Sequence, residues 1–440
     1  MKLWIENGYL VDPASGQEGN CDILICDGRI SRIVRKDEAS EAPGQPEAAS
    51  GGTGKLAQER TERLDATGLI VAPGLVDVHS HFRDPGLTYK EDIETGSRAA
   101  ARGGYTTVVL MANTKPAVDS AETLAYVLRK GRDTGIHVHT CATVTMGMKG
   151  REMVPMKELK AAGAVGFTDD GVPLLDEKVV REAMAAAAEL DVPISFHEEN
   201  PAFIENNGIN RGKASRHFGI GGSDRQAEID LVRRDLQIAL ETGACINIQH
   251  ISTEEAVELV RQAKGQGGNI HAEATPHHIA LTEEAAIRHG TLAKMNPPLR
   301  EERDRQAIIR GLADGTIDVI ATDHAPHSSE EKAKDITQAP SGIIGLETAL
   351  SLGLEHLVDS EKMTMMSFLE KLTCNPARMY HLDAGYIGEG GPADLVLFDP
   401  KATWTSGEYA SRSTNSPFTG KELKGVVKYT ICGGRIVYER

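Results

Sequence analysis

Between residues 69 and 380, short apolar segments typical of buried strands alternate with longer segments that have the 3.6-residue periodicity of amphipathic helices. The strand-like segments are residues 69–76, 105–110, 136–141, 164–168, 193–197, 245–250, 270–275 and 317–322. Helical periodicity is clear at 177–190, 224–241 and 253–263, and the last of these begins with a capping residue, Ser252 or Thr253. Eight repeats of strand followed by helix predict an α/β fold of the (β/α)8 TIM-barrel type.

The two ends of the chain have a different pattern, in which short strands are connected by tight turns. Residues 2–34 contain the hairpin-turn pair Asp27-Gly28, and residues 393–399 and 425–438 contain further strands. We therefore expect residues 1–70 and 381–440 to form one small β domain beside a barrel of residues 71–380. Residues 39–60 are rich in Ala, Gly, Pro, Ser and Glu and predict a flexible surface insertion.

The charge balance and the hydropathy pattern limit the partners that this chain can have. Its 48 Lys and Arg against 64 Asp and Glu give a formal net charge of -16, which disfavours nucleic acid and anionic membranes. No apolar run is long enough to span a bilayer, and the first residues lack a signal-peptide pattern. The six cysteines are widely spaced and form no CxxC pair, which predicts free thiols in a reducing compartment. These features favour a soluble cytoplasmic protein.

Polar residues follow the ends of the predicted barrel strands. They are His79 and His81, Asn113, Asp169 and Asp170, His197, His250, and Asp323. Because reactive side chains of such barrels gather at the C-terminal ends of the strands, we expect these residues to meet at one mouth. His79 and His81 share one side of their strand with Asp77, which could support a ligand histidine. A second pair, His137 and His139, lies early in its strand and is interpreted as structural.

Four histidines and two carboxylates provide enough ligands for two divalent ions. Nitrogen and oxygen ligands without thiolate favour zinc, with manganese and cobalt as alternatives. A water shared by two such ions would lose a proton near neutral pH and become a hydroxide nucleophile. Arg83, directly downstream of the histidine pair, adds a forked cation that suits a carboxylate-bearing small-molecule substrate.

Six motifs in a fixed order give this chain a resemblance to a known family. They are residues 79–86 (HSHFRDPG), 100–107 (AARGGYTT), 111–116 (MANTKP), 167–171 (FTDDG), 294–300 (KMNPPLR) and 322–327 (TDHAPH). Together they resemble the motifs of the long-chain dihydroorotases of the amidohydrolase superfamily, over nearly the whole chain except residues 39–60. The resemblance implies a zinc-dependent cyclic amide hydrolase of pyrimidine biosynthesis that interconverts N-carbamoyl-L-aspartate and L-dihydroorotate through a zinc-bridged hydroxide.

The resemblance also implies the metal ligands. These are His79, His81 and Asp323 for one zinc ion and His197 and His250 for the other, with Asp170 as the bridging carboxylate. Residues 166–170 contain no lysine that could be carboxylated, as the bridging residue is in hydantoinase-like relatives. Asp169 remains the alternative bridge, because the choice of Asp170 depends on motif position.

Roles in substrate binding and proton transfer are implied in the same way. Asp323 is the expected catalytic residue, which moves a proton between the hydroxide and the leaving nitrogen. The expected substrate contacts are Arg83, Asn113 and His327 to the carboxylate, Asn296 and the backbone near Ser341 and Gly342 to the ring, and His81, which also binds metal. The polar segment 326–340 is predicted either to close over the site or to be an ordinary solvated loop.

Two other functions remain as alternatives. A hydantoinase or allantoinase would share the metal site but not the substrate, and both Arg83 and the missing bridging lysine disfavour it. A non-catalytic partner of aspartate transcarbamoylase would usually lack ligands, whereas all six are present here. From the family we expect a homodimer and allow for an association with aspartate transcarbamoylase.

Overall fold

The computed structural model describes residues 2–36 and 61–440. The predicted insertion at 39–60 lies outside these residues. Among the helices of the described part, none is both long and apolar enough to cross a bilayer. All six cysteines lie in the described part and are unpaired, as predicted.

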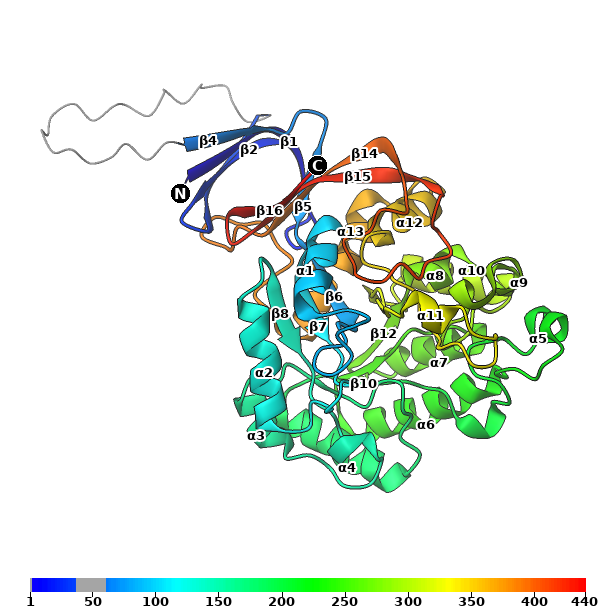
Figure 1. Ribbon diagram of the computed structural model, residues 1–440. Coiled ribbons are helices and arrows are strands. Elements are labelled where there is room, and N and C mark those ends of the chain that lie inside the picture. Colours follow the sequence, from blue (N-terminus) through cyan, green and yellow to red (C-terminus); the bar gives the residue numbers. More distant parts are fainter. Residues whose placement is uncertain (1, 37–60) are drawn as a thin grey trace, which may run out of the picture.

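Eight parallel strands within residues 61–440 form the predicted barrel (Figure 1). They are β6 (Leu75–Ser80), β7 (Tyr105–Leu110), β8 (His137–Thr140), β9 (Phe167–Thr168), β10 (Ile194–Phe196), β11 (Ile246–Ile248), β12 (Ile270–Ala274) and β13 (Val319–Ile320). Each strand pairs with the next along the chain, and a bridge from Ala142 to Phe167 joins β8 to β9. A bridge between Ser80 and His324 closes the ring. The predicted α/β barrel is therefore confirmed.

Asp77 takes part in this closure. Its carboxylate accepts hydrogen bonds from the Thr322 backbone N–H at 2.9 Å and from Thr322 Oγ1 at 2.6 Å, and so links β6 to the end of β13. β13 is shorter than the predicted strand 317–322 at both ends. Asp77 also accepts the His79 backbone N–H at 3.4 Å, so it contacts this ligand candidate through the backbone of the histidine. Its support of the ligand stays a prediction.

Helices follow the barrel strands and cover the outside of the ring (Figure 1). The helices of the described part are α1 (Ile93–Arg102), α2 (Ala121–Arg132), α3 (Met156–Ala161), α4 (Glu177–Leu190), α5 (Lys213–Phe218), α6 (Gln226–Thr242), α7 (Glu254–Gly265), α8 (Pro276–Ala280), α9 (Glu283–His289), α10 (Glu302–Asp314), α11 (Ser329–Lys332), α12 (Ala349–Gly353), α13 (Met365–Leu372) and α14 (Cys374–Met379). Single turns lie at η1 (Met146–Met148), η2 (Pro201–Phe203), η3 (Gly290–Ala293) and η4 (Leu354–Val358). Thr253 caps α7, since its Oγ1 accepts the Ala256 N–H, as one of the two predicted caps.

The two ends of the chain share one sheet beside the barrel (Figure 1). Its strands are β1 (Lys2–Asp12), β2 (Gln17–Cys26), β3 (Arg29–Arg35), β4 (Thr61–Asp65), β5 (Ile70–Pro73), β14 (Leu395–Thr405), β15 (Glu422–Cys432) and β16 (Arg435–Glu439). The order is β16-β15-β14-β5-β1-β2-β3, with β4 paired to β1. Asp27 and Gly28 both have positive φ in the turn between β2 and β3, as the predicted hairpin requires. The domain boundaries at residues 70 and 380 stay a prediction.

Candidate active site

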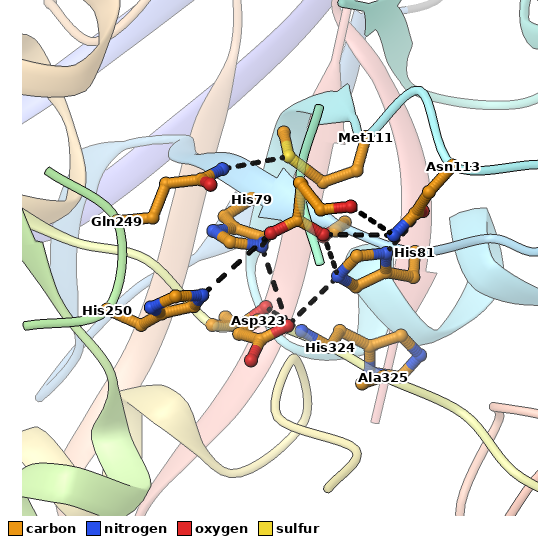
Figure 2. A network of polar contacts seen from close by, with 12 residues as sticks. His79, His81, Met111, Asn113, Gln249, His250, Asp323, His324 and Ala325 are labelled. Carbon is orange, nitrogen blue, oxygen red and sulfur yellow. Dashed lines mark hydrogen bonds and ion pairs between the residues drawn. The ribbon is translucent and has the colours of Figure 1, made fainter. Parts of the chain in front are cut away.

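The six predicted ligand residues converge at the C-terminal mouth of the barrel. Figure 2 shows His79, His81, His250 and Asp323 facing one another there. Asp323 Oδ1, after β13, lies 3.0 Å from His81 Nε2 and 3.5 Å from His79 Nε2, at the end of β6. Asp170 Oδ1, after β9, lies 3.4 Å from His79 Nε2. The same oxygen is 3.8 Å from His197 Nδ1 and 3.8 Å from His250 Nε2. Side chains from five strands thus meet in one buried cluster.

The donor atoms fit divalent cations. They form three overlapping groups, each within 4.8 Å: His79, His81 and Asp170; His79, His250 and Asp323; and Asp170, His197 and His250. His79 Nε2 is buried and has no hydrogen-bond partner among the described residues. Zinc and similar ions bind imidazole nitrogens and carboxylate oxygens, and both face one another in this cluster. Asp170 belongs to two groups that use different histidines, which is the position of a bridging carboxylate.

In three of these imidazoles, the outer ring nitrogen, which is the one that points away from the cluster, contacts a hydrogen-bond acceptor. His79 Nδ1 contacts the Glu273 carboxylate, and His81 Nδ1 lies 3.0 Å from Asn113 Oδ1. His197 Nε2 lies 3.1 Å from Glu199 Oε2. Such acceptors hold the proton on the outer nitrogen, so that the other nitrogen presents its lone pair to a metal.

The two neighbouring aspartates face different ways. The Asp169 carboxylate accepts hydrogen bonds from the Val144 and Thr145 backbone N–H groups, at 2.7 and 3.2 Å, and from the Thr145 hydroxyl. It therefore anchors the loop after β8. Asp170 faces the histidines, so the geometry favours Asp170 as the bridging ligand.

Three residues at this mouth have left-handed backbone conformations that non-glycine residues rarely adopt. Their φ angles are 59° at Arg83, 34° at His250 and 44° at Asp323. Such conformations are unfavourable and persist where the surrounding structure enforces them, often at functional sites. Here they aim a cation and two candidate ligands into the same space.

The buried carboxylates make the cluster attractive to cations. Burial raises the pKa of Asp323, but His79 and His81 outweigh it and hold that pKa below its ordinary value. The pKa of Asp170 is lowered in the same way, mainly by His79. Burial and the charge of Arg83 lower the pKa of His81, which keeps its imidazole neutral. Burial disfavours a charge on His79 and His197, but the carboxylates of Glu273 and Asp170 raise the pKa of His79, and Glu199 raises that of His197. The site thus offers ionised carboxylates, and metal binding would displace a proton from these two imidazoles.

A cavity of about 160 Å³ opens onto the cluster, and it is lined by every residue predicted to contact substrate. These residues are His81, Arg83, Asn113, Asn296, His327, Ser341 and Gly342. Asn113 also contacts two candidate ligands, since its Nδ2 donates to Asp170 Oδ2 at 3.0 Å and its Oδ1 faces His81. Asn296 Oδ1 is buried without a hydrogen-bond partner among the described residues. It is therefore free to accept from a bound molecule.

Arg83 lies in this cavity without a carboxylate partner. Its Nε donates to the Pro326 carbonyl at 3.3 Å, and its guanidinium approaches His327 Nε2 at 3.4 Å. Within residues 2–36 and 61–440, no carboxylate lies within ion-pair distance of it. Asp84 instead pairs with Lys130 at 2.6 Å, and Glu91 accepts from the Arg412 backbone N–H. A half-buried cation without a carboxylate partner favours an anionic ligand.

Comparison with known proteins identifies the family. The profile of the "Amidohydrolase family" matches residues 70–437. The dihydroorotase of Clostridioides difficile (strain 630) is 50% identical over 436 residues, and that of Clostridium acetobutylicum is 51% identical over 441 residues. Each alignment covers 99% of this chain and 99% of the relative. This chain belongs to the amidohydrolase family. The predicted resemblance to its dihydroorotases is confirmed.

Solved structures agree on the fold of this amidohydrolase. The L-hydantoinase (dihydropyrimidinase) from Arthrobacter aurescens has a TM-score of 0.84 at 24% identity and covers 99% of this chain and 96% of its own. A D-hydantoinase has a TM-score of 0.83 at 22% identity, covering 100% and 95%. At these identities the likeness supports the barrel and its β domain. It does not favour the hydantoinase alternative.

Glu273, which lies on β12 and contacts His79 from behind, was not predicted from the sequence. Its carboxylate also accepts from Asn247 Nδ2 at 3.0 Å and from the His250 backbone N–H at 3.3 Å. The sequence held a signal, because Glu273 is an acidic residue between two alanines of a predicted barrel strand. Glu199 was also missed, although it follows the ligand candidate His197 by two residues.

We predict that Glu273→Gln weakens metal binding by this amidohydrolase about 10- to 100-fold, because a neutral amide orients and polarises His79 less well than a carboxylate. Competition with a chromophoric chelator measures the change. Glu189→Gln, at an exposed position on α4, is the matched control. Equal metal affinity in both variants would contradict the role assigned to Glu273.

Two buried lysines hold the polar segment 326–340 against the cavity. Lys332 Nζ donates to the carbonyls of Pro340 and Gly342, at 2.9 and 3.0 Å. Lys294 Nζ donates to those of Ile336 and Ala339, at 2.7 and 2.8 Å. These bonds argue against an ordinary solvated loop, whereas closure over the site stays a prediction.

We predict a pH dependence of stability from Lys332. Burial lowers its pKa from 10.5 to about 7. The unfolded chain therefore binds more protons between these two values, and the free energy of unfolding rises with pH in that window. Urea unfolding at pH 7 and pH 9 measures this change. The free energy of unfolding should rise less between the two pH values in Lys332→Met than in the wild type. The exposed Lys334→Met should behave like the wild type, and an equal rise in all three proteins would refute the prediction.

Proposed function

We propose that this amidohydrolase is a dihydroorotase, which reversibly cyclises N-carbamoyl-L-aspartate to L-dihydroorotate in pyrimidine biosynthesis. The observation that carries the proposal is the unpaired Arg83 guanidinium in the same cavity as the histidine and aspartate cluster. An anionic cyclic amide would place its carboxylate on the cation and its ring carbonyl at the cluster. About 50% identity to curated dihydroorotases over nearly the whole chain supports this substrate.

The metal cofactor of the proposed enzyme is a pair of zinc ions. His79, His81 and Asp323 would hold one, His197 and His250 the other, and Asp170 would bridge them. When bound, the ions would act as Lewis acids that activate a water molecule and polarise the ring carbonyl. Glu273 and Glu199 orient two of the ligand histidines.

Side chains on the cavity wall would position the substrate. Arg83 binds the carboxylate through its guanidinium, with Asn113 and the neutral His327 beside it. Burial and the charge of Arg83 lower the pKa of His327, and its Nε2 lies 2.8 Å from the Ser341 carbonyl. Asn296 and the backbone of Ser341 and Gly342 would contact the ring. Gly342 has φ of 147°, and a side chain there would meet the Ala325 carbonyl at 2.7 Å, so glycine keeps this wall open.

Asp323 is the proposed proton carrier. In ring opening it accepts the proton of the attacking water and delivers it to the leaving ring nitrogen. In ring closure it removes a proton from the ureido nitrogen. The lowered pKa of Asp323 keeps its carboxylate ionised and ready to accept.

Substrate preference tests this proposal. Purified protein is assayed by absorbance for ring opening of L-dihydroorotate, hydantoin and allantoin. We expect turnover of L-dihydroorotate at least about 100-fold faster than of the other two, because only L-dihydroorotate offers a carboxylate to Arg83. Opening of hydantoin or allantoin without opening of dihydroorotate would contradict the proposal. No turnover of any compound by metal-loaded protein would favour the non-catalytic alternative.

We also propose that the enzyme is a cytoplasmic homodimer able to associate with aspartate transcarbamoylase. Free cysteines support a reducing compartment. Light scattering of the purified protein, alone and mixed with the transcarbamoylase, tests both assemblies. A monomer, and no change of mass on mixing, would contradict them.

A further inference from the structure

A second cluster of metal-ligand side chains lies away from the catalytic mouth, where the start of β8 meets the β domain (Figure 1). His137 is the first residue of β8, Asp394 lies just before β14, and Cys432 is the last residue of β15. One ligand atom from each lies within 4.8 Å of the other two. His137 Nε2 is 2.9 Å from Asp394 Oδ2. His137 thus lies at the N-terminal end of a barrel strand, whereas the catalytic ligands lie at the C-terminal ends of the barrel strands.

We propose that His137, Asp394 and Cys432 form a second binding site, independent of the catalytic centre, for a divalent transition metal such as Zn²⁺. One thiolate, one carboxylate and one neutral imidazole balance the charge of a divalent ion. Thiolate and imidazole ligands select zinc or cobalt over magnesium or calcium. His137 belongs to the second histidine pair in the sequence, so a metal-ligand role replaces the structural interpretation of that residue.

The carboxylate of this site is already held in place. Asp394 Oδ1 accepts the Gly433 backbone N–H at 2.7 Å, which leaves Oδ2 directed at His137. The Asp394 carbonyl accepts the Gly74 backbone N–H at 2.9 Å, at the start of β6. These contacts hold the Asp394 carboxylate in position before a metal binds. The entropic cost of ordering this ligand is therefore small.

The thiol has a weak partner that a metal could replace. Cys432 Sγ donates to the Thr106 carbonyl at 3.7 Å. Burial and the nearby Asp394 raise the pKa of Cys432, so the thiol is protonated in the metal-free protein. Binding would exchange this proton for the metal–sulfur bond.

The site is also accessible. Two cavities, of about 520 and 370 Å³, share His137, His139 and Gly433 as lining residues. The His137 side chain is 47% exposed, whereas that of Asp394 is 3% exposed. An ion can enter from the His137 side and keep a water as a fourth ligand. The bound ion would join β8 of the barrel to β14 and β15 of the β domain.

Cobalt substitution distinguishes this site from the catalytic one. The six candidate ligands of the catalytic cluster include no cysteine, so a thiolate-to-Co²⁺ charge-transfer band in the near ultraviolet would report the second site. The full-length wild type, with its metal removed and Co²⁺ added in excess, should show this band. Cys432→Ser should abolish it. His137→Ala should weaken it strongly, and because this residue is half-exposed its loss leaves the core intact.

Cys26→Ser is the matched control, because Cys26 lies on β2 outside the cluster, and this variant should keep the full band. Zinc content by mass spectrometry should fall by one ion per chain in His137→Ala relative to the wild type. Turnover should stay within about two-fold of the wild type in His137→Ala. No band in the cobalt-loaded wild type, or a band that persists in Cys432→Ser, would overturn the proposal.

Discussion

Asp323→Asn is expected to lower kcat for ring opening of L-dihydroorotate by about 10²- to 10⁴-fold, the usual contribution of a general acid–base group. The amide has nearly the shape of the carboxylate but cannot accept the proton of the attacking water. Asp323 Oδ1 lies 3.0 Å from His81 Nε2, at the centre of the cluster. The substitution therefore removes the proton acceptor at the place where the reaction would occur. Steady-state kinetics should give a large fall in kcat with a small change in KM.

The fold and the metal content of this variant must be measured beside its kinetics. Asp323 is buried but exposes its carboxylate to the cavity, so the circular dichroism spectrum should match the wild type. Asp314→Asn, at an exposed position near the end of α10, should keep full activity. Wild-type turnover by a metal-loaded Asp323→Asn protein would refute the proton role.

The second large effect is expected at Arg83. Removing the charged partner of a buried carboxylate costs about 2–5 kcal/mol, which corresponds to a fall in kcat/KM of roughly 30- to 4,000-fold in Arg83→Met. Arg83→Lys should recover part of the loss, because a lysine keeps the charge but not the forked geometry. The exposed Arg98→Met on α1 is the control.

A substrate without the carboxylate isolates this contact. Dihydrouracil has the same ring and lacks the carboxylate, so Arg83→Met should change its turnover little. The preference of the wild type for dihydroorotate over dihydrouracil should therefore shrink in the variant. An equal loss for both compounds would mean that Arg83 supports the site structurally and does not bind the substrate carboxylate.

The fold was predictable because its signal is local. Apolar strands and amphipathic helices alternate along the chain, and parallel strands of a barrel place their C-terminal ends at one mouth. This rule alone predicts that His79, His197 and His250 lie close together. Strand ends were less predictable, as at β13, which spans Val319–Ile320 within the predicted strand 317–322.

Residues that orient the ligand histidines, such as Glu273, were harder to predict. Their contacts join segments that are far apart in the sequence and depend on which way each side chain points. Glu273 meets His79 across 194 positions of sequence, and only the register of β12 in the ring brings them together. The choice between Asp169 and Asp170 was open for the same reason. Both follow β9, and the structure separates them through the bonds of Asp169 to the loop after β8.

Turnover of L-dihydroorotate before and after removal of metal is the most direct test of the catalytic centre. The protein is treated with a strong chelator, freed of it, and assayed by absorbance with and without added Zn²⁺. We predict that ring opening falls to background in the metal-free protein and returns when Zn²⁺ is added. Full turnover by protein shown to contain no metal would contradict the assignment of these six residues.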